Sequence, residues 1–427
     1  MHLADRPVPC HQSSDGQVIG GWASPGRART KRRRTFNVLT LVAVGHGWRL
    51  GVAPGESVVI IGAGSIGRGL VADVVSAAGL RPVFVARQAK GKALRQAGHY
   101  CIRLVGGGQS LVRTVSDYDV ITTDDRRRLR AAIASCQFAA TAVGSQNLPA
   151  IAPLLVDGLA DRAEPLNILL CENAPQGGEV LAQALAARGA SRERFSCVRS
   201  SPEPMVRSLD RSLDLVAERI RTTYVEAAHW LGPAPDIPGF DYWQDITPFY
   251  WRKLYTNNAG HALIAYMGAY LGCTTVAEAV QRAPIRRHLE DLLHAAGAVL
   301  VHEFGLNPEA TRDHLVQLQD ERYPNAELGD TIARLARDPL RKLGPGERLV
   351  GLLRLLQAAH LSTLPVTRVI GAALRYRDPK DPSAAELARR VRRGGPGAVL
   401  ESVCGIAAIE PCFAECIAAF EALECRR

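Results

Sequence analysis

The segment from Ser57 to Gly67 constrains the fold of this chain more than any other. The apolar run Ser57-Val58-Val59-Ile60-Ile61 is followed at once by Gly62-Ala63-Gly64-Ser65-Ile66-Gly67. The run predicts a buried parallel strand, and the G-x-G-x-x-G spacing predicts a turn into a helix N-terminus. In such a turn the first glycine permits a tight bend, the second admits a pyrophosphate and the third allows close helix packing. The segment therefore predicts dinucleotide binding by Gly62, Gly64, Ser65, Ile66 and Gly67.

The hydrophobic pattern that follows divides the chain into two parts. Further short apolar runs predict strands at 82–86, 119–122, 138–143 and 166–171, so a doubly wound sheet extends to about residue 175. Beyond about residue 225 the periodicity is helical, as in 259–271 and 285–303. A chain of 427 residues normally holds more than one core. We therefore expect an α/β protein with a Rossmann domain at 51–225 and a mostly α-helical domain at 226–427.

Residues 1–50 combine Pro, Gly, Ser and basic residues with little periodicity. This composition predicts an extension outside the fold, at least partly disordered. Its basic cluster, Lys31-Arg32-Arg33-Arg34, is either a targeting or nucleic-acid signal or a solvated tail. A lone basic run of this kind favours the tail.

Composition excludes several classes of protein. No stretch reaches the roughly 18 apolar residues needed to cross a bilayer, so we expect no membrane partner. The net charge of +10 is scattered and not interleaved with aromatics, which argues against a nucleic-acid partner. The positive charge is compatible either with a solvated surface or with a site that binds small anions. Ten cysteines without paired spacing, in a chain with no signal peptide, indicate reduced thiols and a cytoplasmic protein.

Four of those cysteines, Cys404, Cys412, Cys416 and Cys425, cluster near the C-terminus and raise the possibility of a metal. Their spacing is not that of a zinc finger or ribbon. We interpret them as small buried helix residues and expect no metal.

The residue that discriminates between cofactors lies about 20 positions beyond the glycines, where an acidic side chain binds the ribose of NAD. Here the sequence reads Val85-Ala86-Arg87-Gln88, with no acid. An arginine can pair with the 2′-phosphate of NADP, although Arg87 is also compatible with an ordinary exposed side chain. We therefore expect NADP or NAD, with NADP favoured.

The segment from Tyr250 to His261 has the composition of a catalytic site. Lys253, Asn258 and His261 lie five and three residues apart, so the last two share a helix face, which Lys253 joins if the helix is regular or kinked nearby. Oxidation of an alcohol needs a base for the hydroxyl proton, and a desolvated lysine can serve. The developing alkoxide needs neutral donors such as asparagine amides. Without knowledge of a family, the residues alone favour an ordinary solvated lysine and two helix-capping polar residues over a catalytic site.

The same segment resembles the Lys-x4-Asn-x2-His signature of the polyol-specific long-chain dehydrogenases, the mannitol dehydrogenase family. Its continuation, 260–268, is similar to the mannitol-1-phosphate branch of that family. The similarity runs from about residue 56 to the C-terminus. Supporting stretches are 61–69, Thr141-Ala142-Val143-Gly144, Cys171-Glu172-Asn173, 297–300 and 338–343.

The resemblance implies roles for these residues. Lys253 would be the general base in polyol oxidation and the acid in carbonyl reduction, Asn173 and Asn258 would bind the reacting oxygen, and His261 would bind a substrate hydroxyl. Val143 and Gly144 would join the cofactor site, and no catalytic metal is implied. The implied reaction interconverts mannitol 1-phosphate and fructose 6-phosphate with a nicotinamide cofactor, in a monomer or weak homodimer.

The chain departs from the family in two places. The acid after the strand at 82–86 is missing, which puts a preference for NAD in question, and one further stretch differs. Relatives carry Val-Asp-Arg-Ile-x-Pro, whereas we match that signature to Pro202-Glu203-Pro204-Met205-Val206-Arg207-Ser208, which lacks the Asp-Arg pair. This departure puts the substrate in question. A phosphorylated substrate requires converging cations. The candidates, each also compatible with a surface charge, are Arg207, Arg341, Lys342, Arg375 and Arg377.

Other functions remain open. The stretch 51–64 also resembles the start of the cofactor domain in medium-chain zinc dehydrogenases, but Cys10, His11 and His46 do not form a plausible ligand set with a carboxylate. The same chemistry on a cyclitol or other modified sugar phosphate, or on a free polyol by a zinc-independent 2-dehydrogenase, is an alternative. A catalytically silent cofactor-binding protein is a further one, against which Lys253, Asn173, Asn258 and His261 all argue.

Overall fold

An eight-stranded sheet forms the first half of the fold. The computed structural model describes residues 56–210 and 212–423, so the expected extension at 1–50, its basic cluster and Cys425 lie outside the described residues. The strand order is β12-β11-β8-β7-β6-β1-β2-β5, and the strands from β8 to β5 run parallel. These parallel strands are β8 (Phe195–Pro202), β7 (Leu166–Leu170), β6 (Phe138–Thr141), β1 (Ser57–Ile61), β2 (Arg81–Ala86) and β5 (Asp119–Thr122).

This order is that of a Rossmann domain, because the chain winds outward from β1 first through β2 and β5 and then through β6, β7 and β8. All five strands predicted from the sequence are present within a residue or two. β1 shows why its run is apolar throughout: Val58 and Ile60 pack into one core, and Val59 and Ile61 into the other. The order reverses between β1 and β6, and ligands of such sheets bind at this point.

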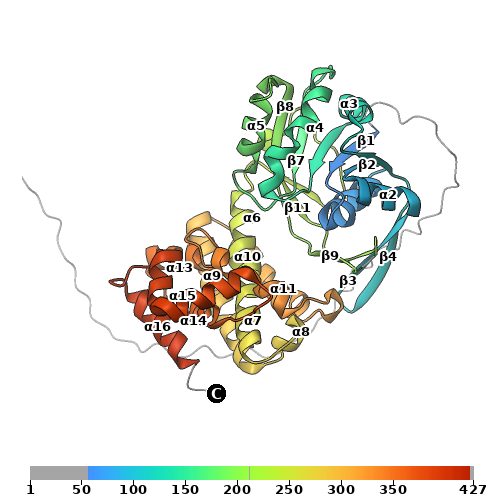
Figure 1. Cartoon of the computed structure of the whole chain (residues 1–427). Coiled ribbons are helices and arrows are strands. Elements are labelled where there is room, and N and C mark those ends of the chain that lie inside the picture. Colours follow the sequence, from blue (N-terminus) through green and yellow to red (C-terminus); the bar gives the residue numbers. More distant parts are fainter. Residues whose placement is uncertain (1–55, 211, 424–427) are drawn as a thin grey trace, which may run out of the picture. The chain divides into compact units, whose positions relative to one another are not determined.

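Helices cover both faces of the sheet, as expected for parallel strands. Figure 1 shows α4 and α5 beside β7 and β8. The helices are α1 (Ala72–Ala77), α2 (Gln88–Ala97), α3 (Arg126–Ser135), α4 (Leu148–Ala160) and α5 (Gly177–Ala186), with the π-helix η1 (Gly67–Val71) before α1 and the short 3-10 turns η2 (Ser145–Asn147), η3 (Arg192–Arg194) and η4 (Ala227–His229).

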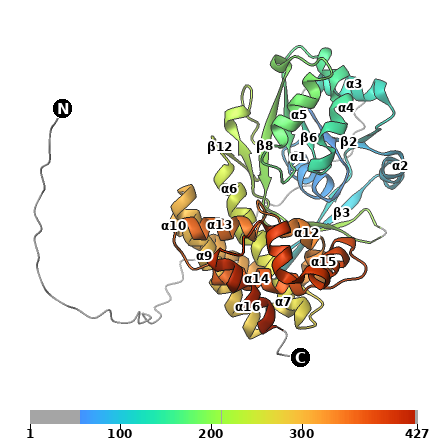
Figure 2. The same cartoon turned by 60° about the vertical axis from the view of Figure 1, so that its left-hand side comes forward.

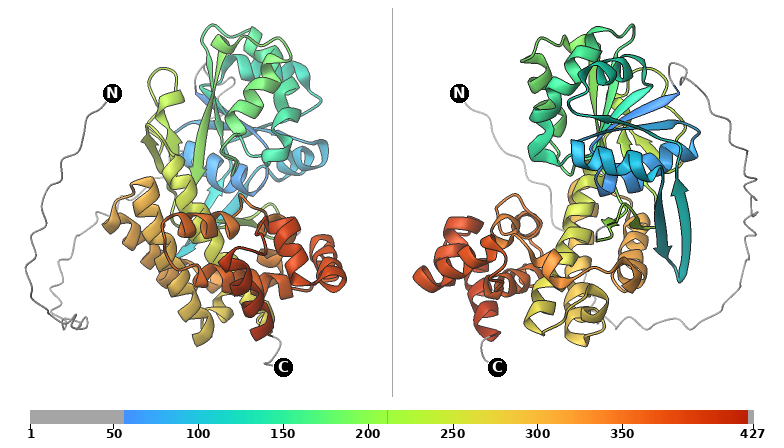
Figure 3. Two further views of the ribbon diagram at one scale, coloured as in Figure 1. Left: turned by 90° about the vertical axis from the view of Figure 1, so that its left-hand side faces the viewer. Right: turned by 45° about the vertical axis from the view of Figure 1, so that its right-hand side comes forward.

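A second, four-stranded sheet was not predicted. Its order is β4-β3-β10-β9, built from the hairpin β3 (Tyr100–Gly106) and β4 (Gln109–Val115) with β10 (Leu215–Glu218) and β9 (Val206–Ser208). Figure 3 shows the long hairpin extending away from the large sheet. β11 (Thr223–Glu226) and β12 (Phe240–Trp243) continue the large sheet, with β11 antiparallel to β8. The expected boundary at 225 thus falls inside a paired strand, and the sheet ends only at Trp243.

The rest of the described chain is helical and shares one hydrophobic core. The predicted helical runs correspond to α7 and α9, and Figure 2 shows α9 together with the later helices α12 to α16. Among the described helices, none is both long and apolar enough to span a membrane. The elements are α6 (Thr247–Arg252), η5 (Lys253–Asn258), α7 (Ala259–Tyr270), α8 (Val276–Ala279), α9 (Ala283–Phe304), α10 (Pro308–Gln317), η6 (Leu318–Arg322), η7 (Ala326–Leu328), α11 (Ile332–Ala336), α12 (Pro339–Lys342), α13 (Val350–Ala358), α14 (Leu364–Arg375), α15 (Pro382–Val399), η8 (Leu400–Cys404) and α16 (Pro411–Ala422).

The C-terminal cysteines belong to this core. Cys404, Cys412 and Cys416 are at most 1% exposed, and the last two lie on α16. Burial raises the pKa of the Cys412 and Cys416 thiols. Their interpretation as small buried helix residues is confirmed for these three positions.

Candidate active site

The glycine turn has the close contacts that its sequence predicts. Gly62 has a φ of +110°, and a Cβ there would lie 2.4 Å from the Ala142 carbonyl oxygen. A Cβ on Gly67 would lie 2.0 Å from the carbonyl oxygen of Gly62, so the turn and η1 pack together without room for a side chain. Gly64 is exposed, and a Cβ there would meet only the Ala142 oxygen, at 3.9 Å. The turn thus leaves its outer surface open at Gly64, as a pyrophosphate requires.

A fully buried arginine holds this turn from behind. The Nε of Arg68, which is 0% exposed, donates to the Ala63 carbonyl at 2.9 Å, and the Tyr100 hydroxyl donates to the Arg68 carbonyl at 2.8 Å. Ser65 and Ser208 share a hydroxyl hydrogen bond of 2.9 Å. The small sheet, through β3 and β9, therefore supports the conformation of the cofactor turn.

The edge of the sheet beyond β2 carries both an arginine and a carboxylate. Arg87 is exposed between β2 and α2. The next residue, Gln88, donates from Nε2 to Asp124 Oδ2 at 2.5 Å. Asp124 follows the adjacent strand β5, so it lies outside the position after β2 at which the sequence pattern places the cofactor-selecting residue.

A buried glutamate connects the loops after β6 and β7. Glu172 Oε1 accepts from the Val143 amide at 2.8 Å, and Oε2 accepts from the Thr141 hydroxyl at 2.5 Å. Gly144, next to Val143, has a φ of +89°. Burial raises the pKa of Glu172, while these hydrogen bonds lower it. Asn173, the adjacent residue, is exposed, so Glu172 links the loop expected to bind the cofactor to the asparagine expected to bind the substrate.

We expect Glu172→Gln to weaken cofactor binding about tenfold. The glutamine lacks the negative charge that strengthens both hydrogen bonds, and the Thr141 hydroxyl would have to accept from the amide instead of donating. Loss of a charge-assisted hydrogen bond costs about 1.5–3 kcal/mol. Titration of NADH and NADPH by fluorescence measures the change. The control is Glu179→Gln, an exposed glutamate on α5. Equal affinities in the two variants would show that Glu172 does not support the loop.

Lys253 lies at the first position of η5, between α6 and α7. Its Nζ donates to the carbonyl of Pro202, the last residue of β8. Burial lowers the pKa of Lys253, the carboxylate of Glu203 opposes this, and the guanidinium of Arg322 adds to the lowering. The thiol of Cys171, two residues before Asn173, acts in the opposite direction and raises the pKa of Lys253. A lysine in this setting loses its proton more readily than a solvated one.

The helix between Lys253 and Asn258 is a π-helix, which sequence periodicity did not predict. Its i→i+5 hydrogen bonds bring residues five apart to nearly the same side, and π-turns are frequent at functional sites. The hydroxyl of Tyr323 donates to the carbonyls of Thr256 and Asn257, each at 3.4 Å. A Cβ on Gly260 would lie 2.2 Å from that hydroxyl, so this helix glycine makes room for the tyrosine.

Asn258 and His261 open into a cavity of about 200 Å³. Burial lowers the pKa of His261 to about 3, and the charges of Arg322, Arg334 and Arg348 add to the effect. The ring packs edge-on against Tyr323, with centroids 5.0 Å apart. His261 is therefore a neutral imidazole. The same cavity is lined by four arginines and one lysine, which are Arg334, Arg337, Arg341, Arg348 and Lys342.

Two of the five cations expected to bind phosphate, Arg341 and Lys342, line this cavity. Arg341 donates hydrogen bonds to Asp338 at 2.7 Å and to Glu347 at 2.8 Å. Burial lowers the pKa of Lys342 to about 7. Arg334, Arg337 and Arg348 were missed, although the density of basic residues between 334 and 348 signals them.

The other three expected cations, Arg207, Arg375 and Arg377, do not line this cavity. Arg207 donates from Nε to the Leu328 carbonyl at 2.9 Å, and its charge lowers the pKa of Arg334. It is therefore a neighbour of the cavity. Arg375 stacks on Phe420 with its guanidinium carbon 3.7 Å from the ring centroid, and Arg377 donates to the carbonyls of Leu374 and Tyr376.

Comparison with known families identifies both halves of the chain. Residues 56–206 match the mannitol dehydrogenase Rossmann domain, and residues 245–393 match the mannitol dehydrogenase C-terminal domain. The mannitol-1-phosphate 5-dehydrogenase of Bacillus pumilus is 31% identical over 358 residues, which cover 81% of this chain and 94% of the relative. The enzyme of the same name from Bacillus velezensis is 31% identical over 363 residues, with coverage of 82% and 95%.

Solved structures show the same fold. The Pseudomonas fluorescens mannitol 2-dehydrogenase, in a ternary complex with NAD and D-mannitol, superposes with a TM-score of 0.68 at 18% identity, over 87% of this chain and 91% of that one. A substrate-free D-sorbitol dehydrogenase gives a TM-score of 0.69 at 16% identity, over 88% and 94%. The similarity to zinc dehydrogenases at 51–64 is thus local. The chain belongs to the mannitol dehydrogenase family and is a nicotinamide-dependent oxidoreductase that acts on CH–OH groups.

Proposed function

We propose that this polyol dehydrogenase acts on a phosphorylated substrate, interconverting mannitol 1-phosphate and fructose 6-phosphate. The observation that carries the proposal is the cavity at Asn258 and His261, where four arginines and Lys342 gather beside the residues expected to bind the polyol. Three carboxylates, those of Asp330, Asp338 and Glu347, pair with these cations and leave an excess of positive charge. Guanidinium groups bind phosphate oxygens with paired hydrogen bonds, which suits this arrangement to a dianion.

In this proposal Lys253 moves the proton. A nicotinamide held by the glycine turn would supply the hydride chemistry at the carbinol carbon. The neutral amine of Lys253 takes the hydroxyl proton in oxidation, and its ammonium form returns it in reduction. The lowered pKa of Lys253 makes the neutral form available closer to neutral pH. The amides of Asn173 and Asn258 would donate to the reacting oxygen, and the neutral His261 would bind a further hydroxyl.

The glycine turn, Arg87 and the Val143–Gly144 loop would hold the dinucleotide. An arginine directly after β2, with no acid at that position, supports NADP as the preferred cofactor. The carboxylate of Asp124 is already engaged by Gln88. Arg87 is then the side chain free to meet a 2′-phosphate.

We expect Arg87→Gln to lower the preference for NADPH over NADH about tenfold, because one charge-assisted phosphate contact is lost while the ribose and pyrophosphate contacts remain. The ratio of kcat/KM values with the two cofactors measures the change. Arg188→Gln is the control, because Arg188 is exposed and lies two residues beyond the end of α5. An unaltered ratio would remove Arg87 from cofactor selection.

The proposed function is tested by following NADH and NADPH oxidation with fructose 6-phosphate, free fructose and phosphorylated and free cyclitol ketones. Rapid turnover of fructose 6-phosphate alone supports the proposal. Preference for free fructose would indicate a 2-dehydrogenase, and preference for a cyclic ketone would indicate a modified-sugar pathway. No turnover of any of these, or of the corresponding alcohols with NAD or NADP, would contradict the proposal and favour a silent cofactor-binding protein.

A further inference from the structure

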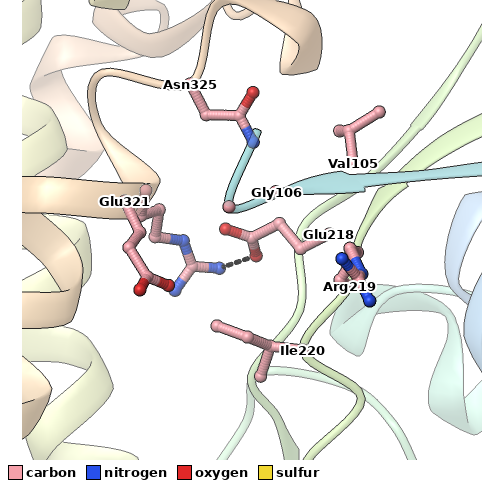
Figure 4. A pocket seen from close by; sticks show the side chains of 9 residues that line it. Val105, Gly106, Glu218, Arg219, Ile220, Glu321 and Asn325 are labelled. Atoms are coloured by element: carbon pink, nitrogen blue, oxygen red, sulfur yellow. Dashed lines mark hydrogen bonds and ion pairs between the residues drawn. The ribbon is translucent and has the colours of Figure 1, made fainter. Parts of the chain in front are cut away.

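A buried ion pair lies close to Lys253 without being part of the substrate cavity. Arg322, at the end of η6, donates from Nη2 to Glu218 Oε2 at 2.5 Å, and the two residues are 7% and 4% exposed. Both residues line a cavity of about 200 Å³, together with Gly106 of the hairpin and Asn325. Figure 4 shows Glu218, Gly106 and Asn325 around this cavity. A buried ion pair contributes little net stability, because desolvation offsets its attraction. Its presence here therefore calls for a role other than stability.

The pair fixes the turn that holds the lysine. Arg322 Nη2 also donates to the main-chain carbonyl of Glu203 at 2.7 Å, and the Met205 amide donates to Glu218 Oε2 at 2.6 Å. Glu203 and Met205 thus have their backbones anchored by opposite members of one pair. The residue before them is Pro202, whose carbonyl accepts from Lys253 Nζ.

The pair also sets the charge around the amine. The charged and titratable groups that act on Lys253 are Glu203, Glu218, Arg322 and Cys171. Glu203 is itself paired with Arg252 at 3.5 Å. The charge of Arg322 also lowers the pKa values of His261, His314 and Tyr323. With both members of the pair present their charges largely cancel at Lys253, and removal of either one leaves an uncompensated charge in a buried site.

We propose that Arg322 and Glu218 are positioning residues for Lys253, which hold the Pro202–Met205 turn against the amine and keep its surroundings free of net charge. This inference rests on the proposed role of Lys253. Neither residue needs to touch substrate or cofactor.

The test compares Arg322→Met, Glu218→Gln and the double variant in the full-length enzyme. The pH dependence of kcat/KM for mannitol 1-phosphate oxidation reports the proton-accepting group. We expect its acidic limb to move up by about 1 pH unit in Arg322→Met and down by about 1 unit in Glu218→Gln. In the double variant the limb should return close to its wild-type position while kcat stays lowered at least tenfold, because the turn has lost both anchors.

A second readout does not depend on turnover. Competitive acetylation of Lys253 by acetic anhydride, followed against pH by peptide mass spectrometry, gives the titration of the amine itself, and the same opposite shifts are expected. Opposite shifts without turnover of any sugar phosphate would support this inference while contradicting the proposed function. The control is Arg354→Met, which breaks the pair with Glu410 and should change thermal stability alone.

The inference would be overturned if the acidic limb of kcat/KM and the titration of the Lys253 amine stayed at their wild-type pH in the single variants. It would also be overturned if they moved in the same direction in both variants. The pair would then be only structural. If Arg322→Met does not fold, Glu218→Gln and the double variant still decide the question, because the inference requires a downward shift in the first and its reversal in the second.

Discussion

Replacement of Lys253 by alanine is expected to lower turnover by about 10²–10⁴-fold, the range over which a positioned proton-transfer group accelerates a reaction. Affinity for the cofactor should stay within about twofold of the wild type. The reason is positional: Lys253 contacts the Pro202 carbonyl at the end of β8, whereas the glycine turn follows β1.

Stopped-flow measurement of hydride transfer and fluorescence titration of NADPH measure the two effects separately. Lys380→Ala provides a matched control, because Lys380 is exposed and lies beyond α14. Wild-type turnover in the Lys253 variant would exclude the lysine from the chemistry. A large loss of cofactor affinity would instead indicate that the variant disrupts the Rossmann domain.

The double variant Arg334→Met, Arg337→Met is expected to lower kcat/KM for fructose 6-phosphate by about 100-fold. Both side chains line the cavity that contains Asn258 and His261, and each charged hydrogen bond to a phosphate contributes about 1.5–3 kcal/mol. Arg334 is also paired with Asp330, so part of its charge is already engaged. Activity with free fructose, which lacks the phosphate, should change less than threefold.

The ratio of kcat/KM for the phosphorylated and free ketoses measures this discrimination. Arg377→Met is the control, because Arg377 was expected from the sequence to bind phosphate but donates to backbone carbonyls at the end of α14. Equal losses with both ketoses in the double variant would place the two arginines outside a phosphate subsite.

The Rossmann strands were predictable because their signal is local. The continuous apolar run of β1 reflects burial on both faces, and Gly62 and Gly67 have no room for a Cβ. Spacing also placed Asn258 and His261 together. The π-helix that begins at Lys253 was not predictable, because it depends on the distant Tyr323, whose hydroxyl binds the carbonyls of Thr256 and Asn257.

The parts that escaped prediction depend on contacts between residues far apart in sequence. The β3–β4 hairpin is one, because its outer strand β4 is mostly exposed and has no apolar alternation facing a core. Arg68, Glu172 and Arg322 are others: each is a charged residue whose burial is explained only by partners on other elements. A single charged residue carries no sequence signal that distinguishes such a position from the surface.

The family signature is also better placed in the structure. Within β8 and its end, Cys197-Val198-Arg199-Ser200-Ser201-Pro202 has its arginine and proline at the third and sixth positions, as in Val-Asp-Arg-Ile-x-Pro. In this register the arginine and the proline are present, whereas Cys197, Val198 and Ser200 replace the valine, the aspartate and the isoleucine. Arg199 forms ion pairs with Glu226 and with Asp245, the latter at 3.3 Å. The carbonyl of Pro202 accepts a hydrogen bond from Lys253 Nζ. The expectation that both members of the Asp-Arg pair are absent came from matching the signature to residues further along the chain.

The proposed chemistry depends on exchange of the proton between the amine of Lys253 and the substrate. Its most direct test is the pH dependence of kcat/KM for mannitol 1-phosphate oxidation in the wild type and in Lys253→Ala. Oxidation needs the neutral amine, so the wild-type rate should rise with pH through a single limb below the ordinary lysine value of 10.5, because burial lowers the pKa of Lys253. If Lys253 carries the proton, this limb disappears in the variant, whose residual rate then follows hydroxide. The same limb at the same pH in both proteins would show that another group carries the proton.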